Sequence, residues 1–202
     1  PDGPGKALKL TIAPVQDRIP IYLAAIGPRN TALAGEIADG WLPILLSPEH
    51  LPSLRGLLAE GAERAGRTLD GFDIVASVSV VVSDDAARAR DAMRPHVALY
   101  VGGMGSRSKN FYNQLVSRYG FEDAAREIQD HYLAGRRRDA MAAIPDALID
   151  LVTLAGPPDA VLARMRAYRD AGVGTLCVAP VPGPPEQVVA QLRLVAELAE
   201  AL

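Results

Sequence analysis

Four short apolar runs alternate along this chain with longer segments in which apolar residues recur every three or four positions. The runs cover residues 19–26, 41–46, 72–82 and 175–180. A run that is apolar on both faces is typical of a strand buried in a parallel sheet, whereas a period of three to four residues is typical of a helix. Strands that alternate with helices predict βαβ units, so we expect an α/β fold with helices outside a parallel sheet.

The third and fourth expected strands are separated by residues 84–173, which are far too many for one crossover. Glycine and proline breaks divide this segment into expected helices at 84–101, 109–118, 121–133, 145–154 and 158–171. Only the last of these helices is needed to return the chain to the sheet. We therefore predict a helical insertion over about residues 84–156, between the last two strands. It should lie near the carboxyl end of the third strand, where α/β folds place their ligands.

Two architectures could accommodate these four strands. One is an open four-stranded sheet. The other is a (β/α)8 TIM barrel, which needs about 250 residues, so that this chain would contain the strands and helices of its second half. We expect residues 19–202 to form this carboxyl-terminal half-barrel. Residues 1–18, which open with Pro and Gly, are expected to form a linker that enters it. Because the chain begins with Pro1 rather than Met, we expect the native protein to be longer.

Composition excludes several classes of protein. With 49% apolar and 22% charged residues, the 202-residue chain can build a core, which excludes a disordered tail. Its formal net charge of −3 gives no electrostatic reason to bind nucleic acid or an anionic membrane. The apolar runs are far shorter than the roughly 20 residues of a membrane helix. The single cysteine, Cys177, cannot form an intrachain disulfide and suits a reducing compartment, so we predict a cytoplasmic protein.

Two motifs flank the first expected helix: Ala-Ala-x-Gly-Pro at residues 24–28 and Ala-Asp-Gly-Trp at residues 38–41. Together with residues 103–113 and 171–176, they resemble the bacterial luciferase-like superfamily. Within it, the chain is most similar to the actinobacterial branch that uses the deazaflavin coenzyme F420 and that is similar to methylenetetrahydromethanopterin reductase. The likeness extends over nearly the whole chain from Ile19 onward.

The resemblance implies a (β/α)8 barrel with an insertion, a cofactor across the carboxyl ends of the strands, and a homodimer when full length. It implies an oxidoreductase that moves a hydride between coenzyme F420 and a small-molecule organic substrate. The family's proposed proton-transfer residues lie on the first four strands, which have no counterpart here, so no catalytic residue is assigned. Two alternatives stay open: an FMN-dependent monooxygenase of the same superfamily, and a non-catalytic half-barrel that binds or supports a partner.

The best candidate cofactor site lies where the first strand meets the first helix. A strand that ends in glycine lets a ligand approach the backbone, and the start of a helix offers free N–H groups and a partial positive charge. Because proline has no N–H, the expected donors are the amides of Gly27, Arg29, Asn30 and Thr31. An ordinary tight turn is the other interpretation, but the resemblance implies phosphate, since the family holds the coenzyme phosphate after its fifth strand. The candidate residues are Ile26, Gly27, Pro28, Arg29, Asn30 and Thr31.

Two further regions are candidates for the same cofactor. Ile44 and Ser47 follow the second strand, so Ser47 could reach the ligand or serve only as the N-cap before Pro48. Residues 102–110 form a glycine-rich, polar and basic stretch that suits an anionic cofactor tail, although a solvated loop between helices has the same composition. The candidate residues in this stretch are Met104, Ser106, Lys109 and Asn110.

The remaining residues of chemical interest have simpler explanations. Three aromatic residues in the insertion could wall a ring-binding pocket or belong to the core; they are Phe111, Tyr112 and Tyr119. The basic run at 136–138 indicates a solvated face. The three histidines are scattered, and no Cys, Asp or Glu stands at metal-ligand spacing from them, so no metal site is predicted. Cys177, in the middle of the last strand, is interpreted as a small core residue.

Overall fold

The computed structural model describes residues 5, 11–13 and 15–202. Its strands are β1 (Tyr22–Leu23), β2 (Gly40–Trp41), β3 (Asp73–Val82), β4 (Leu154–Gly156) and β5 (Thr175–Pro180). Each strand pair is parallel. The expected α/β fold with a parallel sheet is therefore confirmed.

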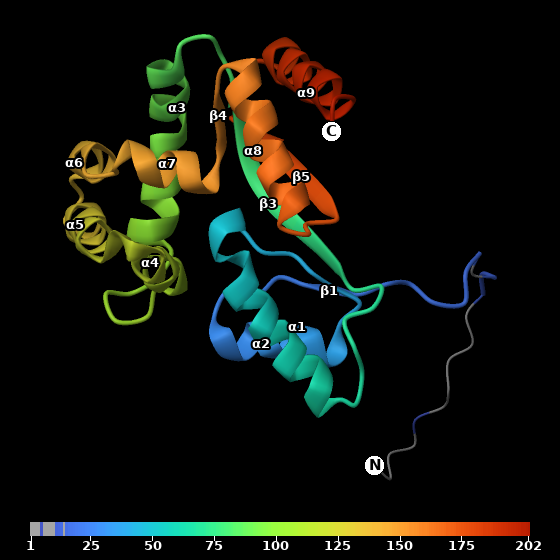
Figure 1. The fold of residues 1–202 in the computed structure, drawn as a ribbon. Helices are drawn as coiled ribbons and strands as arrows, with labels where there is room; N and C mark the ends of the chain where they lie inside the picture. The colour runs from blue at the N-terminus through green and yellow to red at the C-terminus, as the bar shows by residue number, and fades with distance from the viewer. Residues whose placement is uncertain (1–4, 6–10, 14) are drawn as a thin grey trace.

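Helices connect the strands in the expected alternation. After β1 and β2 come α1 (Pro28–Ile37), the 3-10 turn η1 (Pro48–His50) and α2 (Leu51–Arg64). After β4 and β5 come α8 (Pro158–Asp170) and α9 (Pro185–Ala199). Between β3 and β4 lie α3 (Ala86–Ala98), the π-helical turn η2 (Leu99–Gly103), α4 (Phe111–Val116), the π-helical turn η3 (Ser117–Phe121), α5 (Glu122–Leu133), α6 (Arg137–Ala142) and α7 (Asp146–Val152). In Figure 1 the helices between β3 and β4 gather to the left of β3, whereas α1 and α2 lie below it.

The sheet is organised around β3. The amino end of β3 pairs with β2, six of its residues pair with β5, and its carboxyl end pairs with β4. The strand β4 was not expected, because residues 145–154 were assigned to a helix. The helix ends earlier because Thr153 is extended, and a strand of three residues is too short to show a period. The insertion therefore lies between β3 and β4, and not between the last two strands.

The first two strands are much shorter than their apolar runs. Residues beyond β1 and β2 leave the regular ladder, although Ile44 still forms an isolated bridge to Ser77. Pro43 has no N–H to donate, and Leu45 then takes a left-handed conformation with φ of 53°. Ile19 and Ile21, at the start of the first run, are exposed. At the β1–β2 edge of the sheet, the length of the apolar run therefore overestimates the length of the strand.

Side chains of β3 and β5 are covered on only one face. Alternate residues of β3 are fully buried, while those between them are half-buried, and β5 alternates between half-buried and exposed. The expectation that these runs are buried on both faces was therefore wrong for the described residues. Cys177 lies on the more open face and is exposed, so its interpretation as a core residue was also wrong.

Helices α1 and α2 pack with their backbones in contact. A Cβ atom at Gly35 would lie 1.9 Å from the carbonyl oxygen of Leu58, and one at Gly61 would lie 1.7 Å from that of Ala32. Only glycine fits at these two positions, since real Cβ atoms do not approach a carbonyl so closely. This contact fixes the position of α1, whose first turn belongs to the candidate site.

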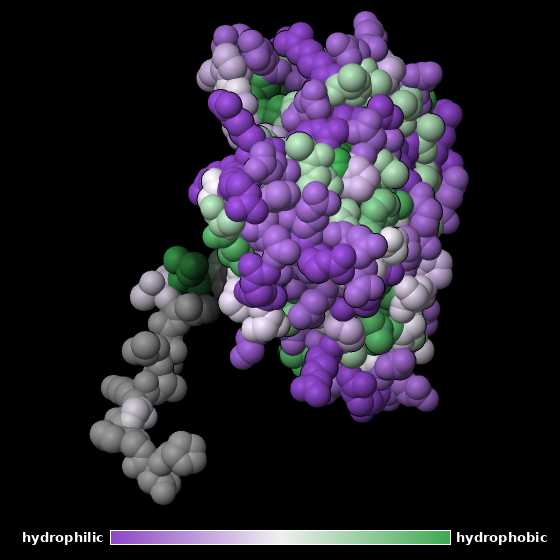
Figure 2. All heavy atoms as spheres, turned by 90° about the vertical axis from the view of Figure 1, so that its left-hand side faces the viewer, coloured by the Kyte–Doolittle hydropathy of each residue, from purple (hydrophilic) through white to green (hydrophobic). Residues whose placement is uncertain are grey.

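Buried side chains form two clusters. The first lies between the sheet and helices α1, α2 and α8, and includes Trp41, Leu58 and Tyr168. The second fills the insertion and includes Met93, Ile128 and Leu148. Figure 2, which faces the insertion side, shows a mostly hydrophilic outer surface. Among the described residues, no helix is long and apolar enough to cross a membrane.

Candidate functional site

The carboxyl ends of β1 and β2 meet the first turns of α1 and α2 and one helix of the insertion. Phe111, the first residue of α4, places its ring 3.7 Å from the position that a Cβ atom would take at Gly27. The insertion therefore reaches the start of α1, although the two segments are more than 80 residues apart. Helix α4 of the insertion therefore lies beside the turn that connects β1 to α1.

The first turn of α1 leaves three amides available. Gly27 is the N-cap with φ of −76° and ψ of 149°, and Pro28 occupies the first helical position. The amides of Gly27, Arg29 and Asn30 make no hydrogen bond to any residue that the structure describes. The amide of Thr31 donates to the Gly27 carbonyl at 2.9 Å, so its expected role as a free donor was wrong. It closes the first turn of the helix instead, and its side chain is fully buried.

The chain turns sharply after β2 at Leu45, and two tyrosines hold this turn. Tyr119 donates its hydroxyl to the Leu45 carbonyl at 3.2 Å, and Tyr168 donates to the Leu46 carbonyl at 2.6 Å. Burial raises the pKa of Tyr119 to about 12 and raises that of Tyr168 above its ordinary value, so both hydroxyls keep their hydrogens. A left-handed leucine costs about 1–2 kcal/mol, which the surrounding contacts must offset.

Ser47 follows this turn and is fully buried. Its hydroxyl donates to Glu49 Oε2 at 2.7 Å and lies 2.9 Å from His50 Nδ1. Ser47 occupies the N-cap position of the turn η1, as predicted, but its side chain makes no capping hydrogen bond. Its role in binding a ligand stays a prediction. Arg164 binds both carboxylate oxygens of Glu49, which lowers the pKa of Glu49 to about 2. The carboxylate is therefore charged, and its charge is neutralised locally.

A cavity of about 280 Å³ opens between the start of α1, the start of α2 and the insertion. Its apolar walls include Ile26, Leu54 and Leu115, and its polar groups include His50, Arg118 and Tyr119. Ile44 lines a much narrower space beneath it, which shares Ile26, Leu54, Leu115 and Tyr119 with the cavity. Ile26 and Ile44 thus line the same narrow space, and their role in cofactor binding stays a prediction.

The glycine-rich stretch of the insertion is only partly available to a ligand. Met104, Ser106 and Lys109 are exposed, and Lys109 makes no ion pair with any described residue. Asn110 is buried, and its oxygen accepts from the amides of Tyr112 and Asn113 at the start of α4. Its amide group donates to the carbonyls of Tyr100 and Val101. All the donors and acceptors of the Asn110 side chain are engaged, so a direct role in binding a cofactor is contradicted by this geometry.

Other residues singled out in the sequence fall on either side of the site. Tyr119 lines the cavity. Tyr112 packs edge-on against Tyr100, with the ring centroids 4.7 Å apart, and belongs to the insertion core. In the basic run, Arg136 pairs with Asp139, and Arg137 lies over the ring of Tyr132. This agrees with a solvated face.

The residues that sequence reasoning missed are those that support the Leu45 turn. His50 was considered only as one of three scattered histidines, and Glu49, Arg164 and Tyr168 were given no role in the site. The available signal was position, because Glu49 and His50 follow closely on the strand expected at residues 41–46, and ligand-binding residues concentrate after such strands.

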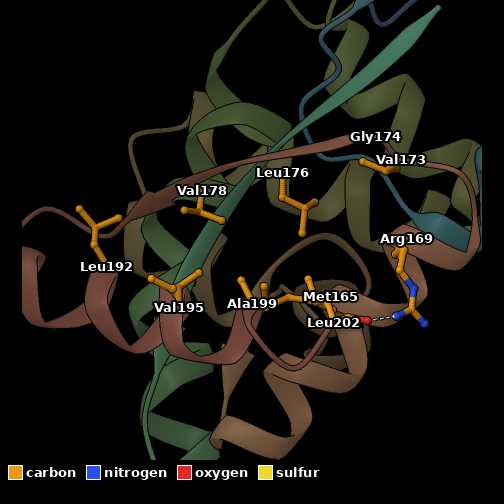
Figure 3. A pocket seen from close by; sticks show the side chains of 11 residues that line it. Met165, Arg169, Val173, Gly174, Leu176, Val178, Leu192, Val195, Ala199 and Leu202 are labelled. Carbon is orange, nitrogen blue, oxygen red and sulfur yellow. Dashed lines mark hydrogen bonds between the residues drawn. The ribbon is translucent and has the colours of Figure 1, made fainter. Parts of the chain in front are cut away.

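A larger cavity, of about 390 Å³, lies elsewhere, between β5, α8 and α9. Figure 3 shows its mostly apolar lining, which includes Met165, Leu176 and Val195. Its charged residue, Arg169, donates to the Leu202 carbonyl. The cavity includes Val173 and Gly174, which precede β5, so it lies toward the amino end of the strand, away from the ligand-binding edge.

The sequence and the fold of this chain are similar to those of known proteins. The family model for luciferase-like monooxygenases matches residues 3–175. A Mycobacterium tuberculosis protein named for coenzyme F420-dependent oxidoreductase activity is 40% identical over 188 residues, which are 92% of this chain and 54% of that protein. The 5,10-methylenetetrahydromethanopterin reductase of Archaeoglobus fulgidus is 30% identical over 179 residues, which are 86% of this chain and 52% of that protein.

Among solved structures, the coenzyme F420-dependent tetrahydromethanopterin reductase of Methanopyrus kandleri matches with a TM-score of 0.71 and 29% identity. The match covers 89% of this chain and 49% of that chain. The present chain thus spans about half the length of the curated relatives it matches.

Proposed function

This chain belongs to the luciferase-like monooxygenase family, and from that premise we propose that it forms part of an oxidoreductase that uses coenzyme F420. The names of the Mycobacterium tuberculosis relative and of the solved Methanopyrus kandleri structure both include coenzyme F420, which supports this choice of cofactor over FMN. When bound, the deazaflavin supplies the hydride chemistry, here with a small organic substrate. The residues of this chain bind and orient the cofactor, and no proton-transfer residue is assigned among them.

The observation that carries the proposal is the set of available amides at the start of α1. The amides of Gly27, Arg29 and Asn30 are free of described partners, and the first turn of α1 contains no acidic residue. The helix start therefore has a partial positive charge that nothing in its own first turn neutralises. The phosphate of the cofactor fits this donor set, and the exposed Arg29 side chain adds a positive charge beside it.

The insertion supplies the second part of the proposed cofactor site. Phe111 lies against Gly27 at the start of α1, and the exposed cation Lys109 precedes Phe111 by two residues in the chain. We assign Lys109, Met104 and Ser106 to the anionic tail of the cofactor. Asn110 holds this stretch in place by capping α4.

The finer architecture is also a proposal: residues 19–202 form the carboxyl-terminal half of a (β/α)8 barrel. Among the described strands β5 pairs only with β3, so its other edge is open. The more exposed face of β3 and β5 is the face that a closed barrel would cover. The half-length match to the relatives supports the same arrangement. Dimerisation of the full-length protein and a cytoplasmic location remain predictions.

Titration of this chain with coenzyme F420, followed by the fluorescence of the deazaflavin, tests the proposed function. We expect F420 to bind and FMN to bind more weakly. An Arg29→Gln variant should bind F420 more weakly, whereas Arg138→Gln, which removes the same charge from the exposed surface of α6, should not. Tight binding of FMN without binding of F420 would overturn the proposal. Oxygen consumption with reduced FMN would then identify a monooxygenase.

A further inference from the structure

The imidazole of His50 is held on one side and open on the other. Its Nδ1 atom lies 2.9 Å from the oxygen of Ser47, whose hydroxyl donates to Glu49 Oε2 at 2.7 Å. A serine hydroxyl has one hydrogen, and here that hydrogen points to the carboxylate. The serine oxygen must therefore accept from Nδ1–H. This places the hydrogen of a neutral His50 on Nδ1 and leaves Nε2 as the free nitrogen.

Two neighbouring contacts fix this arrangement. Arg164 binds the carboxylate of Glu49 through both of its oxygens, so Glu49 stays charged and keeps accepting from Ser47. The ring of His50 packs against the ring of Tyr119, with centroids 4.4 Å apart. The imidazole thus has one orientation. No residue in the described part of the chain hydrogen-bonds to Nε2.

The charges around the cavity leave a net positive field. Glu49 and Arg164 neutralise each other, and Tyr119 keeps its hydrogen. Arg118, which also lines the cavity, makes no ion pair with any described residue. The remaining walls are apolar and include Ile26 and Leu54. The site therefore combines one unpaired guanidinium, one oriented imidazole nitrogen and an apolar surface.

We propose that this cavity binds a small carboxylic acid with an apolar body, whose carboxylate pairs with Arg118 and His50. A neutral Nε2 has no hydrogen to donate, so the bound acid itself supplies the hydrogen that lies between its carboxyl oxygen and Nε2. The carboxylate of Glu49, acting through Ser47, holds the imidazole in the orientation that this hydrogen bond requires. This site goes beyond the proposed cofactor site, because its polar groups lie on the turn η1 and on the turn η3 of the insertion. The two sites share the start of α1 at Pro28, so the acid would lie beside the cofactor phosphate.

Benzoate is a suitable probe, since it has an apolar ring and one carboxylate. We expect benzoate to shift the amide resonances of Leu54 and Leu115, with inorganic phosphate doing so more weakly. Arg118→Gln should weaken benzoate binding about tenfold, because a hydrogen bond to a charged group is lost. Arg138→Gln, a matched change outside the cavity, should leave it unchanged.

The histidine itself is tested by a pair of variants and by its NMR spectrum. His50→Asn keeps a donor toward Ser47 but has no group at the Nε2 position, so it should lose affinity. His50→Gln places an amide near that position and should retain more. The ring nitrogens should show Nδ1 protonated and Nε2 unprotonated at pH 8, and Ser47→Ala should abolish this preference.

The proposal is overturned if benzoate leaves the cavity resonances unchanged, if Arg118→Gln binds like the parent chain, or if Nε2 carries the hydrogen at pH 8. These outcomes do not depend on the cofactor. A chain that binds benzoate but not F420 would contradict only the proposed function, and a chain that binds F420 but not benzoate would contradict only this inference.

Discussion

Removing the hydroxyl of Tyr168 should destabilise the turn that forms the floor of the candidate site. This hydroxyl donates to the Leu46 carbonyl at 2.6 Å, and both residues are fully buried. Tyr168→Phe leaves that carbonyl without a donor in a place that water does not reach. The expected loss is about 1–3 kcal/mol, the usual cost of an unsatisfied buried polar group. The left-handed Leu45 beside it makes the upper part of that range more appropriate.

Urea unfolding measures this loss directly. Trp41 is the only tryptophan and is buried, with its indole N–H on the Ala25 carbonyl, so its fluorescence reports on the core around the site. With a slope of about 2 kcal/mol per molar urea, a loss of about 2 kcal/mol lowers the unfolding midpoint by about 1 M. Tyr119→Phe should cost less, about 0.5–1.5 kcal/mol, because its hydrogen bond is longer and borders the cavity.

A third variant provides the reference for these two. Tyr100 is half-buried, and its hydroxyl makes no hydrogen bond to any described residue, so Tyr100→Phe removes an oxygen without breaking a pair. We expect its midpoint to stay close to that of the parent chain. If Tyr168→Phe unfolds at the same urea concentration as Tyr100→Phe, the reasoning about the Leu46 carbonyl is refuted.

Three further outcomes are expected. The ion pair of Glu49 with Arg164 should stabilise the fold above about pH 4.5, and this stabilisation should be lost as the pH falls toward 2, because the pKa of Glu49 is lowered in the folded state. The carboxylate is half-exposed, which limits the stabilisation to about 1 kcal/mol. Arg164→Met should therefore make the urea midpoint less dependent on pH between about 4.5 and 2. Gly61→Ala should cost more than about 2 kcal/mol in urea unfolding through backbone overlap, whereas Gly56→Ala, which meets nothing within 4 Å, should be neutral or stabilising. Asn110→Ala removes the cap of α4 and should cost about 1–2 kcal/mol by thermal unfolding.

Elements with a long, regular pattern could be predicted from sequence, and elements set by distant contacts could not. The strand β5 was placed at its observed bounds, and β3 within one residue, because each is a continuous apolar run bounded by turn residues. The strand β4 has three residues and shows no period. It forms only because the carboxyl end of β3 offers it a partner.

The candidate site also has one part that could be predicted from the sequence and one part that could not. The start of α1 was predictable, because glycine before proline at a helix start is a local signal. The support of the Leu45 turn was not, since Tyr168 is 122 residues from Leu46 in the chain. Asn110 was assigned to a ligand because the glycine-rich stretch around it has a composition that suits both a ligand-binding loop and a solvated loop. Only the structure shows that the polar atoms of its side chain bind the backbone at the start of α4 and in the turn η2.

The central claim is that the first-turn amides of α1 bind the phosphate of coenzyme F420. The most direct measurement is a titration of the isotope-labelled chain with F420, following individual backbone amides by NMR. We expect large shifts at Gly27, Arg29 and Asn30, and a small one at Thr31, whose amide is already engaged. Saturation with F420 that leaves these three resonances in place would contradict the account.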